Sequence, residues 1–234
     1  LIKEILSSYY QMLELYQNNE IILKKSIEAN NIWLTALENR PINLQEVAEF
    51  CFTLLETKNM TKASEHIALS LLKKDNCQLT DKQTHLFEQY RKLAIGKTAP
   101  NFVFENKEKR GTKQDLKHLK NAFKLVVFGA SWCPNCQTDY PSLVGKYKKL
   151  KEKHDLEVIY VALDTDIQTF RTYYKEAPFI TFCDAKGWET QAAKEYYVFA
   201  TPTYILLNKD LKILAKYQSP EQFEDWFKLQ KINN

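Results

Sequence analysis

The stretch KLVVFGASWCPNC, residues 124–136, decides the fold of the second half of this chain. Residues 124–129 form a short apolar run that ends in a glycine, which predicts a buried β-strand. Residues 134–153 have the pattern of a helix, so Cys133 and Cys136 lie where a strand passes into a helix. A cysteine at a helix N-terminus faces unpaired N–H groups, which favour the thiolate, and a cysteine one turn later can form a disulfide with it. The pattern therefore indicates thiol–disulfide exchange.

Strands and helices alternate beyond this stretch. We expect a second buried strand at 157–163, helices at 166–176 and 189–198, β-rich segments at 203–207 and 212–217, and a last helix that opens at Ser219 and Pro220. Strands separated by helices predict a βαβ unit with a parallel core, and the two last β-rich segments predict a closing hairpin.

Residues 1–95 have the apolar spacing of helices throughout, and we expect them to pack as a bundle. Two helix starts show the order of a capping box, Asn43 with Glu46 and Thr80 with Gln83. Gly96 then ends the helical pattern. We therefore place a domain boundary near residue 95, with an all-α domain at 1–95 that binds a partner or dimerises, and a redox domain at 96–234.

Four aromatic residues of the helical domain lie partly outside the apolar faces that we expect to form its core. They are candidate contacts with another surface: Trp33, Phe50, Phe52 and Phe87.

The composition excludes several classes of protein. Of the 234 residues, 44% are hydrophobic and 26% are charged, which excludes a wholly disordered chain. The net charge of +4 is too small for a dedicated nucleic-acid binder. No apolar run approaches the ~18 residues of a transmembrane helix. Because the chain begins at Leu1 and not at a methionine, we expect any signal peptide to lie outside it.

The cysteine pair has alternative interpretations. A structural zinc site needs four ligands, but Cys51, Cys77 and Cys183 are solitary and the histidines are scattered. The pattern therefore favours a redox pair over a zinc site or an inert buried pair. We expect Cys51 and Cys183 to be buried hydrophobic residues, and a Cys51–Cys77 bridge is left open.

Residues 128–136 resemble the active-site segment of thioredoxin-fold proteins, and most of all that of the TlpA/ResA-type thiol-disulfide oxidoreductases of the cell envelope. Residues 96–102 are similar to the entry motif of that family, Pro141 matches its helix proline, and residues 200–204 resemble its cis-proline loop. The resemblance covers about residues 96–234. It implies an α/β chain with a C-terminal thioredoxin fold, a mixed central sheet flanked by helices, after the all-α domain.

The resemblance also implies roles for single residues. Cys133 would be the attacking thiol and Cys136 the resolving thiol. Asp139 stands where relatives often carry a glutamate, and a buried carboxyl group there would pass a proton to Cys136. An exposed acid without a role is the alternative for Asp139.

The substrate-binding surface that the resemblance implies consists of Trp132, Pro134, Thr201 and Pro202, with Pro202 in a cis peptide bond. No metal is implied, and no cofactor beyond the redox-active disulfide Cys133–Cys136.

The function implied is an enzyme that exchanges disulfides with protein thiols, more often as a reductase fed by an upstream electron donor. Val127 is apolar where cytosolic thioredoxins usually bury an acid, which argues against a general cytosolic thioredoxin. The resemblance itself implies the cell envelope or periplasm of a bacterium. A disulfide oxidase or isomerase, and a scaffold module that acts through its helical domain, are the alternatives. We expect no nucleic-acid partner, no transmembrane segment in this chain, and either partner binding or homodimer formation through residues 1–95.

Overall fold

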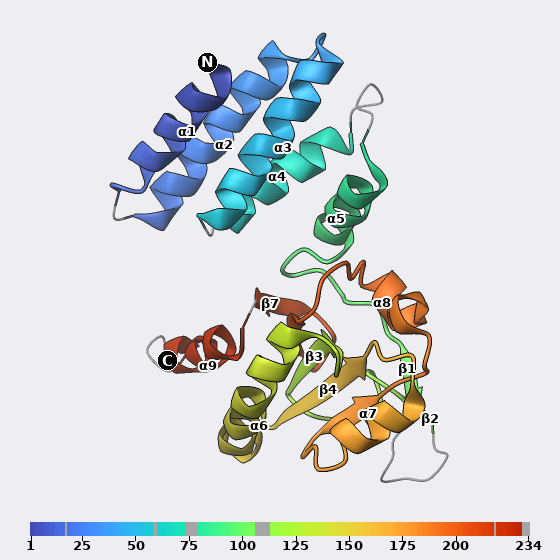
Figure 1. Ribbon diagram of the computed structural model, residues 1–234. Helices are drawn as coiled ribbons and strands as arrows, with labels where there is room; N and C mark the ends of the chain where they lie inside the picture. The colour runs from blue at the N-terminus through green and yellow to red at the C-terminus, as the bar shows by residue number, and fades with distance from the viewer. Residues whose placement is uncertain (17, 59, 74–78, 106–112, 218, 231–234) are drawn as a thin grey trace. The chain divides into compact units, whose positions relative to one another are not determined.

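The computed structural model describes residues 1–234 except 17, 59, 74–78, 106–112, 218 and 231–234. The chain divides into two compact units, Leu1–Arg91 and Lys92–Asn234 (Figure 1). We call the first the helical unit and the second, which contains the β-strands, the sheet unit. In the described residues, no helix combines the length and the apolar character that crossing a bilayer requires.

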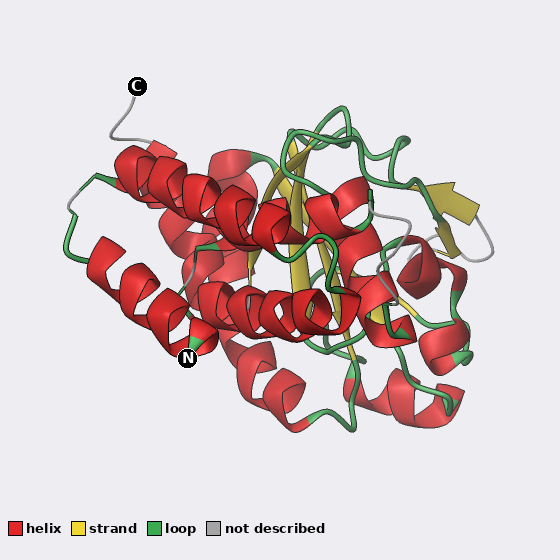
Figure 2. Ribbon diagram, turned by 90° about the horizontal axis from the view of Figure 1, so that it is seen from above, coloured by secondary structure: helices red, strands yellow, loops and turns green. Residues whose placement is uncertain are grey.

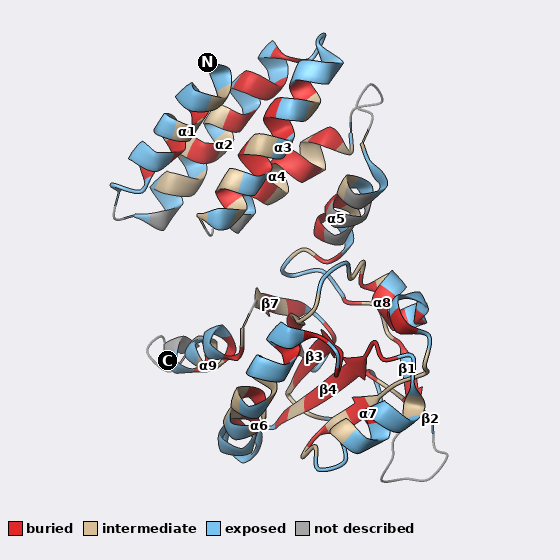
Figure 3. Ribbon diagram, viewed as in Figure 1, coloured by how far each residue is buried: buried red, intermediate tan, exposed pale blue. Residues whose placement is uncertain are grey.

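The helical unit is built from helices whose apolar faces meet in one core. These helices are α1 (Ile2–Leu13), α2 (Asn19–Ala36), α3 (Pro41–Thr57), α4 (Thr61–Leu71) and α5 (Asp81–Lys92). Figure 3 shows buried residues along the facing sides of α1 to α4. Trp33, Phe52 and Phe87 belong to this core and Phe50 packs against it. The prediction of a contact with another surface is wrong for Trp33, Phe52 and Phe87, because the bundle needs their large side chains to fill its own interior. Phe50 is only partly buried, so for this residue the prediction stays a prediction.

The two capping-box predictions have different outcomes. At α5, the Thr80 N–H donates to Gln83 Oε1 at 2.9 Å and the Gln83 N–H donates to Thr80 Oγ1 at 3.2 Å, which confirms the prediction. At α3, the helix begins at Pro41 with Arg40 as its N-cap, so the start predicted at Asn43 is wrong. Proline suits the first position of a helix because its φ is already fixed near the helical value.

A buried polar network joins three helices of this unit. The Tyr10 hydroxyl on α1 donates to Asn30 Oδ1 on α2 at 2.5 Å and accepts from Trp33 Nε1 at 3.1 Å. Asn30 Nδ2 donates to the carbonyl oxygen of Ala63 on α4 at 2.9 Å. Both Tyr10 and Asn30 are fully buried. The network stabilises the bundle only while each buried polar atom keeps its partner.

The sheet unit contains a five-stranded mixed sheet with the strand order β5-β4-β3-β6-β7. The central β3 (Phe123–Gly129) pairs in parallel with β4 (Leu156–Ala162), which pairs in parallel with β5 (Ile180–Phe182). On its other side β3 pairs antiparallel with β6 (Thr203–Asn208), which pairs antiparallel with β7 (Ile213–Tyr217). A separate hairpin of β1 (Val103–Glu105) and β2 (Lys113–Asp115) stands apart from this sheet (Figure 2).

Helical segments flank the sheet, which confirms the predicted mixed α/β fold. They are α6 (Pro134–His154), α7 (Ile167–Tyr173), the 3-10 turn η1 (Gly187–Glu189), α8 (Gln191–Glu195) and α9 (Pro220–Gln230). Successive side chains of a strand point to opposite faces of its sheet. Accordingly Leu125 and Val127 of β3 share a core with α6 and α9, whereas Val126 and Phe128 share a core with α8.

We expect Tyr10→Phe to lower the free energy of unfolding by about 1–3 kcal/mol, because Asn30 Oδ1 and Trp33 Nε1 lose a buried hydrogen-bond partner. Urea unfolding followed by far-UV circular dichroism measures the change. The matched control is Tyr16→Phe, at a tyrosine that is 41% exposed, and it should stay within about 0.5 kcal/mol of the wild type. Equal effects of the two substitutions would contradict the role of the network.

Candidate active site

The two cysteines lie at the start of α6, directly after the central strand. Cys133 is the N-cap residue of α6 and Pro134 occupies the first helical position. The sulfur of Cys133 accepts a hydrogen bond from the Cys136 N–H at 3.2 Å, so it takes the place of the oxygen that usually caps a helix. This geometry brings the sulfur to the positive end of the helix.

The turn between β3 and α6 is tied to the end of β4. The Ser131 N–H donates to Asp164 Oδ2 at 3.2 Å, and the Ser131 hydroxyl donates to the same carboxylate. The Leu163 N–H donates to the Gly129 carbonyl at 2.7 Å, and Gln137 Nε2 donates to the Ser131 carbonyl at 2.6 Å. Ser131 and Asp164 are both buried. The turn is therefore fixed before any substrate arrives.

Gly129 allows this turn to pass close to the sheet. A Cβ atom at that position would lie 2.1 Å from the hydroxyl oxygen of Tyr160, inside any acceptable contact. Tyr160 is only 2% exposed and sits among other rings, so it has no room to move away. A larger residue at 129 would therefore displace the segment that carries the cysteines.

The thiols of Cys133 and Cys136 differ in acidity. Their sulfur atoms lie 2.6 Å apart. Burial by itself raises the pKa of Cys133, but its hydrogen bonds with Cys136, Thr201 and Asn135 outweigh burial and hold that pKa below its ordinary value. Burial raises the pKa of Cys136 to about 12, and the adjacent Cys133 adds to the rise. One thiol therefore ionises readily, while its neighbour stays protonated at neutral pH.

The loop before β6 lies against Cys133. The Thr201–Pro202 peptide bond is cis. The Cys133 thiol contacts the carbonyl oxygen of Thr201 at 3.5 Å. The sheet register explains this contact, because Phe128 near the end of β3 is paired with Thr203 at the start of β6.

Trp132 and Pro134 flank Cys133 on the surface. Trp132 is 52% exposed, although it is a large aromatic residue, and Pro134 is exposed as well. The structure thus places Thr201 in contact with Cys133, whose chain neighbours are Trp132 and Pro134, and Pro202 follows Thr201 through the cis peptide bond.

Asp139 contacts a tyrosine that the sequence did not single out. The Tyr204 hydroxyl on β6 donates to Asp139 Oδ2 at 2.9 Å. Burial raises the pKa of Asp139, and the negative charge of Glu221 raises it further. The hydrogen bond from Tyr204 acts in the opposite direction, but the pKa of Asp139 remains above its ordinary value. Burial and the charges of Asp139 and Cys136 raise the pKa of Tyr204, so this tyrosine lies within electrostatic range of both groups. Asp139 is half-buried and partnered, not the exposed acid that was its alternative.

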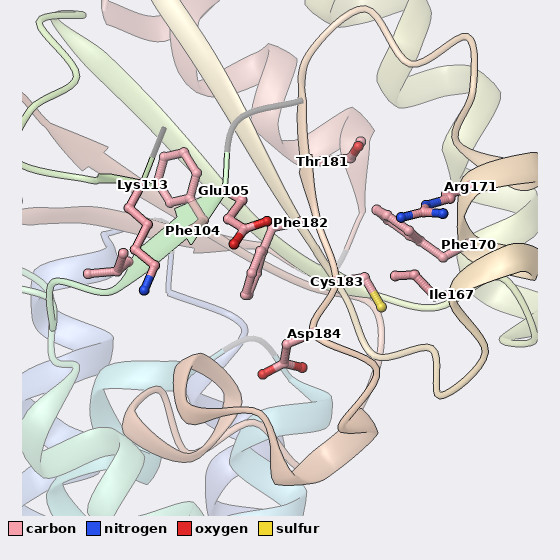
Figure 4. Close-up of a pocket in the computed structure, with 11 residues that line it drawn as sticks. Phe104, Glu105, Lys113, Ile167, Phe170, Arg171, Thr181, Phe182, Cys183 and Asp184 are labelled. Carbon is pink, nitrogen blue, oxygen red and sulfur yellow. The ribbon is translucent and has the colours of Figure 1, made fainter. Parts of the chain in front are cut away.

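Two other described cysteines are poor nucleophiles. Cys51 is buried in the helical unit, where burial raises its pKa to about 12. Cys183 lines a cavity of about 420 Å³ beside Asp184, Ile167 and Phe182 (Figure 4). Burial raises the pKa of the Cys183 thiol, which donates to the carbonyl oxygen of Asp164 at 3.3 Å. Cys51 carries no disulfide, and Cys77, its suggested partner, lies outside the described residues.

Within the described part of the chain, no group of three histidine, cysteine or acidic side chains gathers in a way that could hold a metal ion. The residues that sequence reasoning missed are Ser131, Asp164 and Tyr204. The sequence position of Asp164 could have indicated its role. It is an acidic residue just after a buried strand, and functional sites often form in the loops at the carboxyl edge of a parallel sheet. The sequence gives no such indication for Tyr204, because a tyrosine in a buried strand is expected to be a core residue.

The sheet unit matches a known protein family. The Redoxin family model matches residues 94–229. The thiol-disulfide oxidoreductase ResA of Bacillus cereus is 34% identical over 150 residues, which is 61% of this chain and 82% of ResA. The ResA of Bacillus anthracis is 33% identical over the same length and the same shares.

Solved structures show the same fold. A thioredoxin-like protein from Bacteroides caccae aligns with a TM-score of 0.70 at 18% identity, over 97% of this chain and 83% of its own. That likeness extends through the helical unit. The thioredoxin domain of a thiol-disulfide oxidoreductase from Bacteroides vulgatus aligns with a TM-score of 0.52 at 22% identity, over 61% of this chain and 99% of the domain.

We expect Asp139→Asn to gain stability relative to the wild type as the pH rises from 4 to 7. The pKa of Asp139 is raised in the folded protein, so the fold holds this proton more tightly than the unfolded chain does. The wild type therefore loses stability as the pH rises from the ordinary carboxyl pKa through the raised pKa of Asp139. The Asp139→Asn variant has no carboxyl group to titrate at this position, so it does not show this loss. Urea unfolding at both pH values measures the difference.

Asp166→Asn is the control of opposite sign. Hydrogen bonds from Thr169 and Gln168 at the start of α7 lower the pKa of Asp166, so its charge stabilises the fold at pH 7. The Asp166→Asn variant should therefore become less stable relative to the wild type as the pH rises from 4 to 7. A gain at both positions, or no pH dependence at 139, would contradict the assigned environment of Asp139.

Proposed function

Because this chain belongs to the Redoxin family and is a thiol-disulfide oxidoreductase of the TlpA/ResA type, we propose that Cys133 and Cys136 are its redox-active pair. The observation that carries the proposal is the unequal acidity of two sulfur atoms 2.6 Å apart at a helix N-terminus. A nucleophile has to be a thiolate, whereas the resolving thiol has to wait until the mixed disulfide has formed.

The proposed reaction transfers two electrons from the protein to a substrate disulfide. The Cys133 thiolate attacks one substrate sulfur, the substrate S–S bond breaks, and the released substrate thiolate takes up a proton. Cys136 then loses its proton and attacks the Cys133 sulfur. The mixed disulfide breaks and the second substrate thiolate leaves as a thiol. The protein ends with a Cys133–Cys136 disulfide, and the substrate ends with two thiols.

Asp139 is the proposed acceptor of the Cys136 proton. Its raised pKa makes this carboxylate a stronger base than an ordinary aspartate, and Tyr204 holds it by a hydrogen bond. Tyr204 is also within electrostatic range of Cys136, so it is a positioning residue for this step. Asp139 is one methylene shorter than the glutamate that the resemblance implies at this position, and the hydrogen bond from Tyr204 supports a role for the shorter side chain.

Trp132, Pro134, Thr201 and Pro202 form the proposed surface for a protein substrate. The Thr201 carbonyl contact places backbone beside the reacting sulfur, where a substrate strand could pair with it. We propose that the protein works as a reductase in a bacterial cell envelope, re-reduced by an upstream thiol donor. The resemblance to ResA-type proteins supports this direction and location.

The helical unit contributes recognition or homodimer formation, not chemistry, in this proposal. Its described cysteine, Cys51, is buried with a pKa near 12 and so is protonated at neutral pH. Its apolar faces close on their own core instead of lining a reactive site.

We expect Cys133→Ser to abolish reduction of a model protein disulfide such as that of insulin, because no other described thiol is both acidic and placed at a helix N-terminus. Cys136→Ser should instead accumulate a mixed disulfide through Cys133, which mass spectrometry detects. Asp139→Asn should slow resolution of that intermediate without preventing its formation.

Cys51→Ser and Cys183→Ser are the matched controls and should keep the activity of the wild type. Full activity of Cys133→Ser would overturn the assignment of the nucleophile, and a wild type without activity would favour a scaffold role. Equilibration of the wild type with glutathione gives the reduction potential of the cysteine pair, and this potential indicates whether the protein works as a reductase or an oxidase. A potential near about −270 mV is that of a reductant, whereas one near about −120 mV would overturn the reductase direction.

A further inference from the structure

Two tryptophans meet on the surface beside the attacking cysteine. Trp132 directly precedes Cys133, and Trp188 comes from η1, far along the chain. Their ring centroids lie 6.3 Å apart. Both rings remain open to solvent, with exposures of 52% for Trp132 and 40% for Trp188. Phe199, which is 42% exposed, stands two residues before Thr201, whose carbonyl contacts Cys133.

A single exposed aromatic residue needs no explanation, but Trp132 and Trp188 form an exposed ring pair, and Trp132 directly precedes Cys133 in the chain. Trp188 belongs to neither core of the sheet unit, so it does not fill the interior. Tryptophan is the residue that most often dominates binding energy when it is buried by a partner. We propose that Trp188, together with Trp132, binds an apolar side chain next to the cysteine of a substrate protein, an inference that rests on the proposed function.

The turn that carries Trp188 is held by specific contacts. The Lys186 N–H donates to Asp184 Oδ1 at 3.1 Å, and the buried Thr190 hydroxyl donates to Asp184 Oδ2 at 2.9 Å. Gly187 has a φ of +57°, and a Cβ atom there would lie 3.0 Å from Thr165 Cγ2. The turn is thus fixed on both sides of Trp188, so presenting this ring costs little conformational entropy at binding.

The chemistry of the surface selects its occupant. The two indole rings offer an apolar face next to Cys133 in the chain. Glu189, which follows Trp188, pairs with Lys194 of α8 at 2.6 Å, so Lys186 is the exposed charge that the turn itself adds. A charged group gains little from such a face, whereas a Phe, Leu or Tyr side chain gains by leaving water and by packing against the rings. Trp188 therefore sets a preference for apolar residues that flank the substrate disulfide, and it has no part in the acidity of Cys133.

The test uses two peptide disulfides of equal length and charge, which differ only in carrying Phe or Gly beside the reacting cysteine. The full chain reduces both in this account, with a higher kcat/KM for the Phe peptide. Trp188→Ala should lower kcat/KM for the Phe peptide about five- to tenfold, mainly through KM, and leave the Gly peptide within about twofold. Trp188→Phe, which keeps an aromatic ring, should restore most of the preference.

The outcomes separate this inference from the proposed function. If the wild type reduces neither peptide, the proposed function fails. If it reduces both and Trp188→Ala keeps the preference, the assignment of Trp188 fails. If Trp188→Ala slows both peptides equally and also changes the pH dependence of Cys133 alkylation, Trp188 acts on the thiol and the docking role is overturned. Should the alanine variant fail to fold, Trp188→Gln replaces the ring by a polar side chain and should lose the preference in the same way.

Discussion

The positive end of α6 is the feature on which the rest of the site depends, because it receives the sulfur of Cys133. The Cys136 N–H at 3.2 Å is a helix donor that has no partner within its own helix, and the sulfur supplies one. Negative charge on that sulfur is therefore stabilised, which offsets the cost of burying it. Cys136 is the third residue of α6, and burial dominates its pKa.

The register of the sheet brings the other parts of the site to this helix end. Because β3 lies between β4 and β6, the turn after β3 meets the end of one neighbour and the beginning of the other. Asp164 follows β4 and binds Ser131, while Thr201 precedes β6 and contacts Cys133. A shift of β6 by one residue would turn Tyr204 away from Asp139, because side chains alternate along a strand. The geometry of the thiols thus depends on pairing that extends along the whole of β3.

Local signals in the sequence predicted much of this arrangement. The apolar run of β3, the proline at the first position of α6 and the cysteine spacing each act over a few residues, and a resemblance to a family supplied the loop at Pro202. What was missed depends on contacts between distant segments. The hairpin of β1 and β2 and the strand β5 are each three residues long, too short for a periodic signal.

Buried polar residues likewise depend on contacts between distant segments, which local sequence signals do not reveal. Lys124 opens the apolar run and looks like a solvent-exposed end of the strand, yet it is fully buried. Its Nζ donates to the carbonyl oxygens of Asn121 at 3.1 Å and Lys209 at 3.2 Å. The segment of Lys209 comes from another part of the chain, so residue type alone could not indicate the contact. Tyr204 was missed for the same reason, since its hydrogen-bond partner Asp139 lies more than fifty positions away in the chain.

The structure makes Cys133 the more acidic thiol and keeps Cys136 protonated. The direct measurement is the rate at which iodoacetamide alkylates each cysteine of the reduced full-length chain as a function of pH, followed peptide by peptide by mass spectrometry. Cys133 should react at a lower pH than the other thiols that the structure describes, because only the thiolate is alkylated. Cys51, Cys136 and Cys183, whose pKa values are raised by burial, should react only at higher pH. If Cys136 reacts first, or if Cys133 follows the same pH curve as Cys183, the account is contradicted.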